Sequence, residues 1–148
     1  MTALMSEKLP VVAALDPVSQ AAGTVVTGYA DMGKTKQVMF VLSVGAMGAG
    51  GTVDAKIRQA TDSAGTGVKD VTGKAITQLT QAGGDGNKQV VIGVRADELD
   101  VAGGFNHVAL SITVATAASL ISAIGIGGEP RYAPVDGIDL TSVDEIVN

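Results

Sequence analysis

Short strand-like runs separated by glycine-rich turns constrain the fold of this chain more than any other feature. About eight such runs, rich in valine, isoleucine, alanine and threonine, recur along the 148 residues, with turns such as GAMGAGG and AGGDGN between them. In the run 105–116, Val108, Leu110, Ile112 and Val114 alternate with smaller or polar residues. Alternation with a period of two predicts a strand that buries one face.

The strand-like runs are evenly spaced, and no long amphipathic helix interrupts them. They span 10–15, 23–29, 36–45, 51–62, 74–81, 88–96, 105–116 and 119–128. This spacing predicts an all-β fold, an antiparallel β-sandwich that is jelly-roll-like, although spacing does not give the strand order. We expect five large residues in the core: Val53, Ile57, Val91, Leu110 and Ile112.

The two ends of the chain lack the alternating pattern. We therefore expect a β-sandwich domain at 10–128, an N-terminal arm at 1–9 and a C-terminal arm at 129–148. Ser142 and Glu145 have the spacing of a capping box, which predicts a short terminal helix. The segment DELDVAGG, which begins at Asp97, is expected to form one helical turn or a corner.

Arg131 and Tyr132 stand together in the predicted C-terminal arm. Arginine and tyrosine are enriched where proteins meet, so we predict that these two residues contact a partner. The alternative is a frayed end without a role.

Composition and charge exclude several classes of function. The chain has no cysteine and one histidine, so it has no disulfide and no thiolate metal site. A net charge of −5 argues against nucleic acid as a partner, because phosphate binding needs clustered Lys and Arg. The longest apolar stretch, TVATAASLISAIGIGG, is too short and too polar to span a bilayer, and the N-terminus lacks the apolar core of a signal peptide. The mean hydropathy of +0.35 indicates either surface that other chains cover or merely abundant alanine and valine.

The segment GYADMGKT, residues 28–35, matches the phosphate-loop pattern G-x-x-x-x-G-K-S/T. A phosphate loop needs a helix directly after it, because the helix N-terminus helps to hold the phosphates. Here KQVMFVLSVG follows and predicts a strand, and Asp31 places a carboxylate inside the supposed cradle. We interpret the segment as a turn and keep nucleotide binding as an alternative function.

No group of residues has the spacing of a catalytic or metal site. His107 is the only histidine, and alternation places it with Ser111 on a polar sheet face, a poor setting for a general base. Asp97, Glu98 and Asp100 lack the calcium-loop pattern and are interpreted as a solvated acidic corner. We therefore expect no enzymatic activity, no cofactor, no metal and no small-molecule substrate, and a function that depends on protein surfaces.

Several segments carry a resemblance to a known group of proteins: VDAKIRQATDSAGTG, DVTGKAITQLT, VRADELDV and PRYAP. The chain resembles the head decoration (capsid cement) proteins of tailed bacteriophages over about 11–135, most densely over 51–114. The resemblance implies a virion protein that assembles in the host cytoplasm and binds and stabilises the outside of a capsid shell. Its implied partners are the major capsid protein and neighbouring copies of itself, as a homo-oligomer. The alternative is another phage structural role, as a head–tail completion or tail protein.

Overall fold

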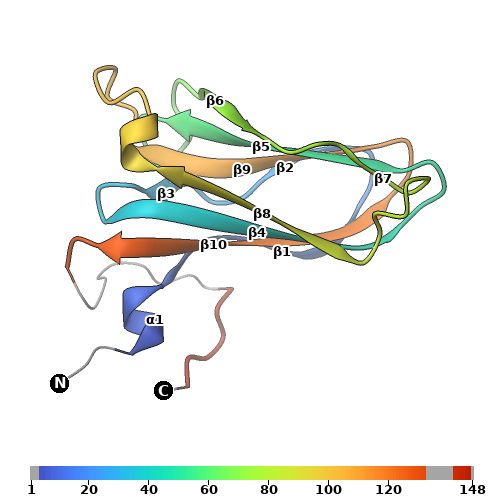
Figure 1. Ribbon diagram of the computed structural model, residues 1–148, viewed down its shortest axis with the longest axis horizontal. Helices are drawn as coiled ribbons and strands as arrows, with labels where there is room; N and C mark the ends of the chain where they lie inside the picture. The colour runs from blue at the N-terminus through green and yellow to red at the C-terminus, as the bar shows by residue number, and fades with distance from the viewer. Residues whose placement is uncertain (1–3, 133–141, 148) are drawn as a thin grey trace.

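Two antiparallel sheets stack face to face in the computed structural model, which describes residues 4–132 and 142–147 (Figure 1). Sheet A contains β1 (Val11–Gln20), β4 (Thr35–Met47), β8 (Lys88–Arg95) and β10 (Ser119–Pro130). Sheet B contains β2 (Gly23–Val26), β5 (Thr52–Ala60), β6 (Lys69–Ala75) and β9 (His107–Ala115), with the short strands β3 (Ala30–Asp31) and β7 (Leu79–Thr80). The only helices in the described residues are α1 (Met5–Lys8) and the 3₁₀ helix η1 (Ala96–Glu98). The predicted all-β antiparallel sandwich is confirmed.

The strand order is that of a jelly roll. Sheet A has the order β1-β10-β4-β8, and sheet B has the order β2-β9-β5-β6. Among the eight longer strands, the first therefore pairs with the last, the second with the seventh, the third with the sixth and the fourth with the fifth. Such nested pairing arises when one long hairpin is rolled up into two sheets, and it confirms the jelly-roll-like prediction.

The core lies between the two sheets. Phe40 and Leu42 of β4 are fully buried in one cluster with side chains of sheet B. Burying an aliphatic or aromatic side chain of this size contributes about 1.5–3 kcal/mol. Four of the five predicted core residues are confirmed, each at 0% exposure: Val53, Ile57, Leu110 and Ile112.

The fifth predicted core residue, Val91, is 60% exposed, so that prediction is wrong. The alternation in KQVVIGVR groups Val91 with Gln89, Gly93 and Arg95, and the prediction overlooked that the more apolar face is the other one. In the structure Val91 pairs with Val41 of β4 on the outward face, while Val90, Ile92 and Val94 pack toward the core.

The predicted strand at 74–81 is divided into β6 and β7. Both strands pair with β5. β6 pairs with the C-terminal half of β5, and β7 pairs with Thr52 and Val53 at the start of β5. Between β6 and β7 the Ile76 N–H donates to the Ala55 carbonyl at 3.0 Å.

Strand β1 is longer than predicted, because a register shift between Leu15 and Val18 accommodates Pro17 at the sheet edge.

The ends differ in part from the predicted arms. Residues 5–8 of the predicted N-terminal arm form α1, which lies beside β10 (Figure 1). β10 continues to Pro130, opposite Thr35, so the sandwich extends past the predicted boundary at 128. The predicted helix at Ser142 and Glu145 is wrong, since residues 142–147 are not helical, and a single turn lacks the packing that would stabilise it. The remainder of both arms, 1–3, 133–141 and 148, lies outside the described residues.

The expected helical turn near Asp97 is η1. None of the helices in the described part of the chain is long and apolar enough to cross a membrane.

Candidate interaction surfaces

The outward side of sheet A, which we call the apolar face, carries rows of aliphatic side chains. Strand register places Ala14, Ile124, Val41 and Val91 in one row across β1, β10, β4 and β8. Ile124 is 41% exposed and Val91 is 60% exposed. The neighbouring row contains Val11, Ile126, Met39 and Gly93, and Met39 is 40% exposed. Side chains of this kind are usually covered in a soluble protein when they form a contiguous surface.

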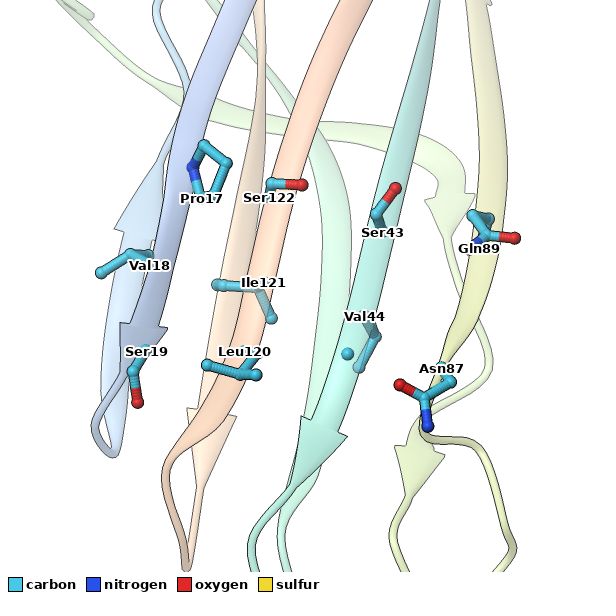
Figure 2. Close-up of a pocket in the computed structure, with 11 residues that line it drawn as sticks. Pro17, Val18, Ser19, Ser43, Val44, Asn87, Gln89, Leu120, Ile121 and Ser122 are labelled. Atoms are coloured by element: carbon cyan, nitrogen blue, oxygen red, sulfur yellow. The ribbon is translucent and has the colours of Figure 1, made fainter.

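Two hollows flank the row of Ile124, Val41 and Val91. The first, of about 520 Å³, is shown in Figure 2, where Ser122 of β10 and Ser43 of β4 lie side by side. Leu120 and Pro17 border it in the same view.

The second hollow has a volume of about 600 Å³ and lies at the other end of the row. Leu9, Met39, Val91 and Ile126 contribute its apolar walls. Its depth comes from Gly93, where an added Cβ would meet only the Val38 carbonyl oxygen, at 3.7 Å.

The outward side of sheet B is charged. Asp70 of β6 lies 3.0 Å from Lys56 Nζ and 2.9 Å from Arg58 Nε, both on β5. The hydrogen bond from Lys56 is the main reason that the pKa of Asp70 lies below its ordinary value. This pattern is that of a solvated surface, so the two faces of the sandwich differ in character.

The sheet B face nevertheless buries two small residues of its central strand. Ala109 is fully buried and Ser111 is 6% exposed, opposite Arg58 and Lys56 respectively. The aliphatic stems of these long side chains cover them while their charged ends remain in water. The polar face predicted around His107 is therefore only partly open, and the Nδ1 atom of His107 lies 2.6 Å from the Asn106 Oδ1 atom.

The two predicted partner-contact residues lie at one end of the sandwich, next to the turn between β3 and β4. The Arg131 N–H donates to the Lys34 carbonyl at 3.0 Å, and Tyr132 is 84% exposed. Arg131 borders a hollow of about 230 Å³ together with Val101 and Phe105, and Val101 is 66% exposed. We call this surface the Arg131 end. Contact of Arg131 and Tyr132 with a partner stays a prediction.

The segment 28–35 contains the short strand β3 and, over residues 32–34, a turn that leads into β4. The Asp31 carboxylate accepts a hydrogen bond from the Gly33 N–H at 2.7 Å, and the Lys34 N–H donates to the Asp31 carbonyl at 3.1 Å. The Gly33 amide, which a phosphate would need, is therefore already bound by a carboxylate. The buried Thr35 begins a strand of 13 residues, so the interpretation as a turn before a strand is confirmed.

The acidic residues after β8 bind basic residues from β6. Glu98 lies 2.9 Å from Lys74, and Asp100 lies 2.6 Å from Lys69. These hydrogen bonds are the largest causes that lower the pKa of Glu98 and of Asp100. Within residues 4–132 and 142–147, no three His, Asp or Glu side chains are grouped to hold a metal ion.

Sequence reasoning did not identify the apolar face as a candidate site. Two signals for it were present in the sequence: the positive mean hydropathy and the run SLISAIGIGG, which is apolar on both sides of the strand. Neither signal says which side of a strand faces outward.

No model of a protein family matches the sequence, and no curated protein matches it. Three similar solved structures have low scores. The CBM22-1–GH10 modules of endo-1,4-β-D-xylanase 10B from Clostridium thermocellum share 14% identity at a TM-score of 0.40, over 82% of this chain and 27% of that chain. The structure of broad bean stain virus shares 14% identity at a TM-score of 0.39, over 84% of this chain and 63% of that chain. The structure of the Gt strain of infectious bursal disease virus shares 11% identity at a TM-score of 0.26, over 84% of this chain and 42% of that chain.

This chain therefore spans less than two thirds of each of these three chains. Similarities this weak carry no conclusion about function. The resemblance to phage decoration proteins stays a prediction.

Proposed function

We propose that this chain is a structural protein of a phage virion, a decoration or cement protein that binds and stabilises the outside of a capsid shell. The apolar face supports an assembly role most directly. It leaves Ile124, Met39 and Val91 exposed on neighbouring strands, whereas the opposite sheet presents charged pairs to water. A contiguous apolar surface of this kind is typical of a protein that another protein covers. The assignment to a phage shell is supported by the sequence resemblance.

The proposed role depends on stiffness and copy number. The jelly roll has one buried core, which favours a stiff domain, and many copies on a shell add modest contacts into a large total affinity. The partners in this proposal are the major capsid protein and neighbouring copies of the chain, on the exterior of the virion. No catalysis, cofactor or nucleic acid takes part in it.

The Arg131 end is the surface that we propose contacts the shell. It combines a hollow bordered by Arg131 and the exposed Val101 with the exposed Tyr132, which follows Arg131 in the chain. Tyrosine and arginine contribute strongly to binding when a partner excludes water from them.

The test uses purified shells that lack the protein. The wild type should sediment with the shells and raise the temperature at which they rupture. The double variant Arg131→Ala with Tyr132→Ala should keep its circular dichroism spectrum and bind more weakly. Lys56→Ala, which removes a positive charge from the sheet B face, is the matched control and should bind as the wild type does.

Absence of wild-type binding to shells would contradict the proposed function. If the double variant binds as tightly as the wild type, the function stands and the assignment of the Arg131 end is wrong.

The C-terminal arm is tested separately with a chain that ends at Tyr132, because a cut after Glu129 would remove Pro130 from β10.

A further inference from the structure

We infer that the apolar face is an interface between two copies of this chain, packed face to face about a two-fold axis. The inference deepens the proposed function, on which its place in a shell rests, by naming the partner that covers this face. Three properties of the face support it: the absence of charge from its two aliphatic rows, its area and its shape.

Charge favours a second copy on this side of the sandwich. The two aliphatic rows of sheet A carry no charged residue, and the charges of this side lie toward its edges. Lys74, Arg95 and Glu98 border the second hollow, where Lys74 pairs with Glu98 at 2.9 Å and Arg95 with Asp97 at 3.1 Å, and Asp16 is exposed in β1. Packing two copies through the sheet B face would remove water from Lys56, Arg58 and Asp70, which is costly for charged groups. Contact through the two aliphatic rows avoids this cost.

The net charge of −5 opposes the approach of a second copy and limits which surface can join two copies. Two copies of an acidic chain repel each other at a distance, so a surface that joins them has to gain its stability from apolar contact. Of the outward sides of the two sheets, only that of sheet A offers contiguous aliphatic rows.

The area of the face is sufficient for a dimer. Four strands about 4.8 Å apart, with a rise of about 3.3 Å per residue, present a surface of roughly 20 by 30 Å, or about 600 Å² on each copy before the part beside β10 that α1 and Leu9 occupy is subtracted. Two whole faces would bury about 1,200 Å² in total, so the part left free by α1 and Leu9 is close to the ~1,000 Å² that a specific interface needs.

The shape of the face suits packing against itself. The row of Ile124, Val41 and Val91 stands between the two hollows described above. In a two-fold arrangement the row of each copy enters a hollow of the other. Met39, which borders one hollow, has a flexible side chain that fills irregular gaps.

The test measures the mass of the free protein in solution, without shells. Sedimentation equilibrium across a range of concentrations should show a wild-type dimer that dissociates on dilution. Ile124→Lys should weaken the dimer by at least about 100-fold, because a charge would then be buried in the interface. Val26→Lys is the matched control, since Val26 is 42% exposed on the sheet B face and Ile124 is 41% exposed on the apolar face.

A second variant is needed because Ile124→Lys could dissociate the dimer by unfolding the chain. Val91→Lys changes the most exposed member of the same row, so it should retain the wild-type spectrum and also dissociate the dimer. The inference is overturned if the wild type is a monomer at every concentration, or if both lysine variants keep the wild-type mass.

These outcomes are independent of shell binding. A monomer that binds shells would leave the proposed function standing and place another partner on the face. A dimer that does not bind shells would contradict the proposed function and leave the interface standing.

Discussion

The ring of Phe40 on β4 lies against Gly125, its register partner on β10, and leaves no room for a side chain there. A Cβ at position 125 would lie 2.9 Å from Phe40 Cε1 and 3.3 Å from the Cβ of Ala13. Phe40 is fully buried, so the glycine allows the bulkiest core side chain to fit beneath the middle of sheet A.

Gly125→Ala should therefore overpack the core. We expect a loss of about 1–3 kcal/mol in the free energy of unfolding, the usual cost of adding a carbon to a filled interior. Urea denaturation followed by circular dichroism measures this loss. Gly28→Ala is the control, because a Cβ at that position would meet no atom within 4 Å. Equal effects at the two positions would show that the close contact with Phe40 is not the cause.

Ile112→Ala should leave a cavity in sheet B. Ile112 is fully buried in the core, and a truncation of this kind costs about 2–4 kcal/mol. The same urea titration measures the change. Val26→Ala, on the exposed side of the same sheet, should change the free energy of unfolding by less than about 0.5 kcal/mol. A small effect at Ile112 would contradict the described packing.

Stability should fall in acid partly through Glu98. This carboxylate binds Lys74 at 2.9 Å and accepts a hydrogen bond from the Arg95 N–H at 2.9 Å, and these contacts lower its pKa below the ordinary value of 4.5. The stabilising contribution of a group with a lowered pKa is complete above its unfolded-state pKa. It is lost as the pH falls through the folded-state pKa.

The melting temperature of Glu98→Gln should consequently depend less on pH below about 4.5 than that of the wild type. The two proteins should converge as the pH falls, because protonation removes the same charge that the substitution removes. Thermal melts at a series of pH values give the comparison. Asp97→Asn, whose side chain is 73% exposed, should follow the wild-type curve closely. A difference between Glu98→Gln and wild type that grows in acid would have the wrong sign for this account.

Nucleotide should not bind to the segment 28–35. Asp31 occupies the Gly33 amide, and a strand follows where a phosphate loop requires a helix. Calorimetric titration with Mg·ATP and with Mg·GTP should give no heat of binding, and Lys34→Ala should leave the fold unchanged. Micromolar binding that Lys34→Ala abolishes would restore the nucleotide-binding alternative.

Sequence patterns predicted those parts of this fold that depend on local alternation. The inward positions of β5 and β9, such as Ile57 and Leu110, were identified because their neighbours on the strand are polar or small. Val91 was misplaced because it lies between two other large aliphatic residues, Val90 and Ile92, although alternation along β8 groups it with Gly93 and Arg95 on the outward face. The jelly-roll order likewise depends on contacts between residues far apart in the chain.

One of the two candidate surfaces could be predicted from the sequence, and the other could not. Arg131 and Tyr132 were found from residue type, and the structure places both of them exposed at one end of the sandwich. The apolar face could not be found from sequence alone, because Ala14, Ile124, Val41 and Val91 come from four strands. Each of the four strands contributes one ordinary aliphatic residue to this row, and only the strand register shows that the four residues form one surface.

The number of copies in a purified virion tests the proposed function most directly. Quantitative mass spectrometry of particles can compare this chain with the major capsid protein. A decoration protein should be present at a fixed and substantial ratio to the shell subunits, because each equivalent site on the shell binds one assembly of the chain. A single ring of copies per particle would instead identify a head–tail or tail component, and complete absence from the particle would contradict a virion role altogether.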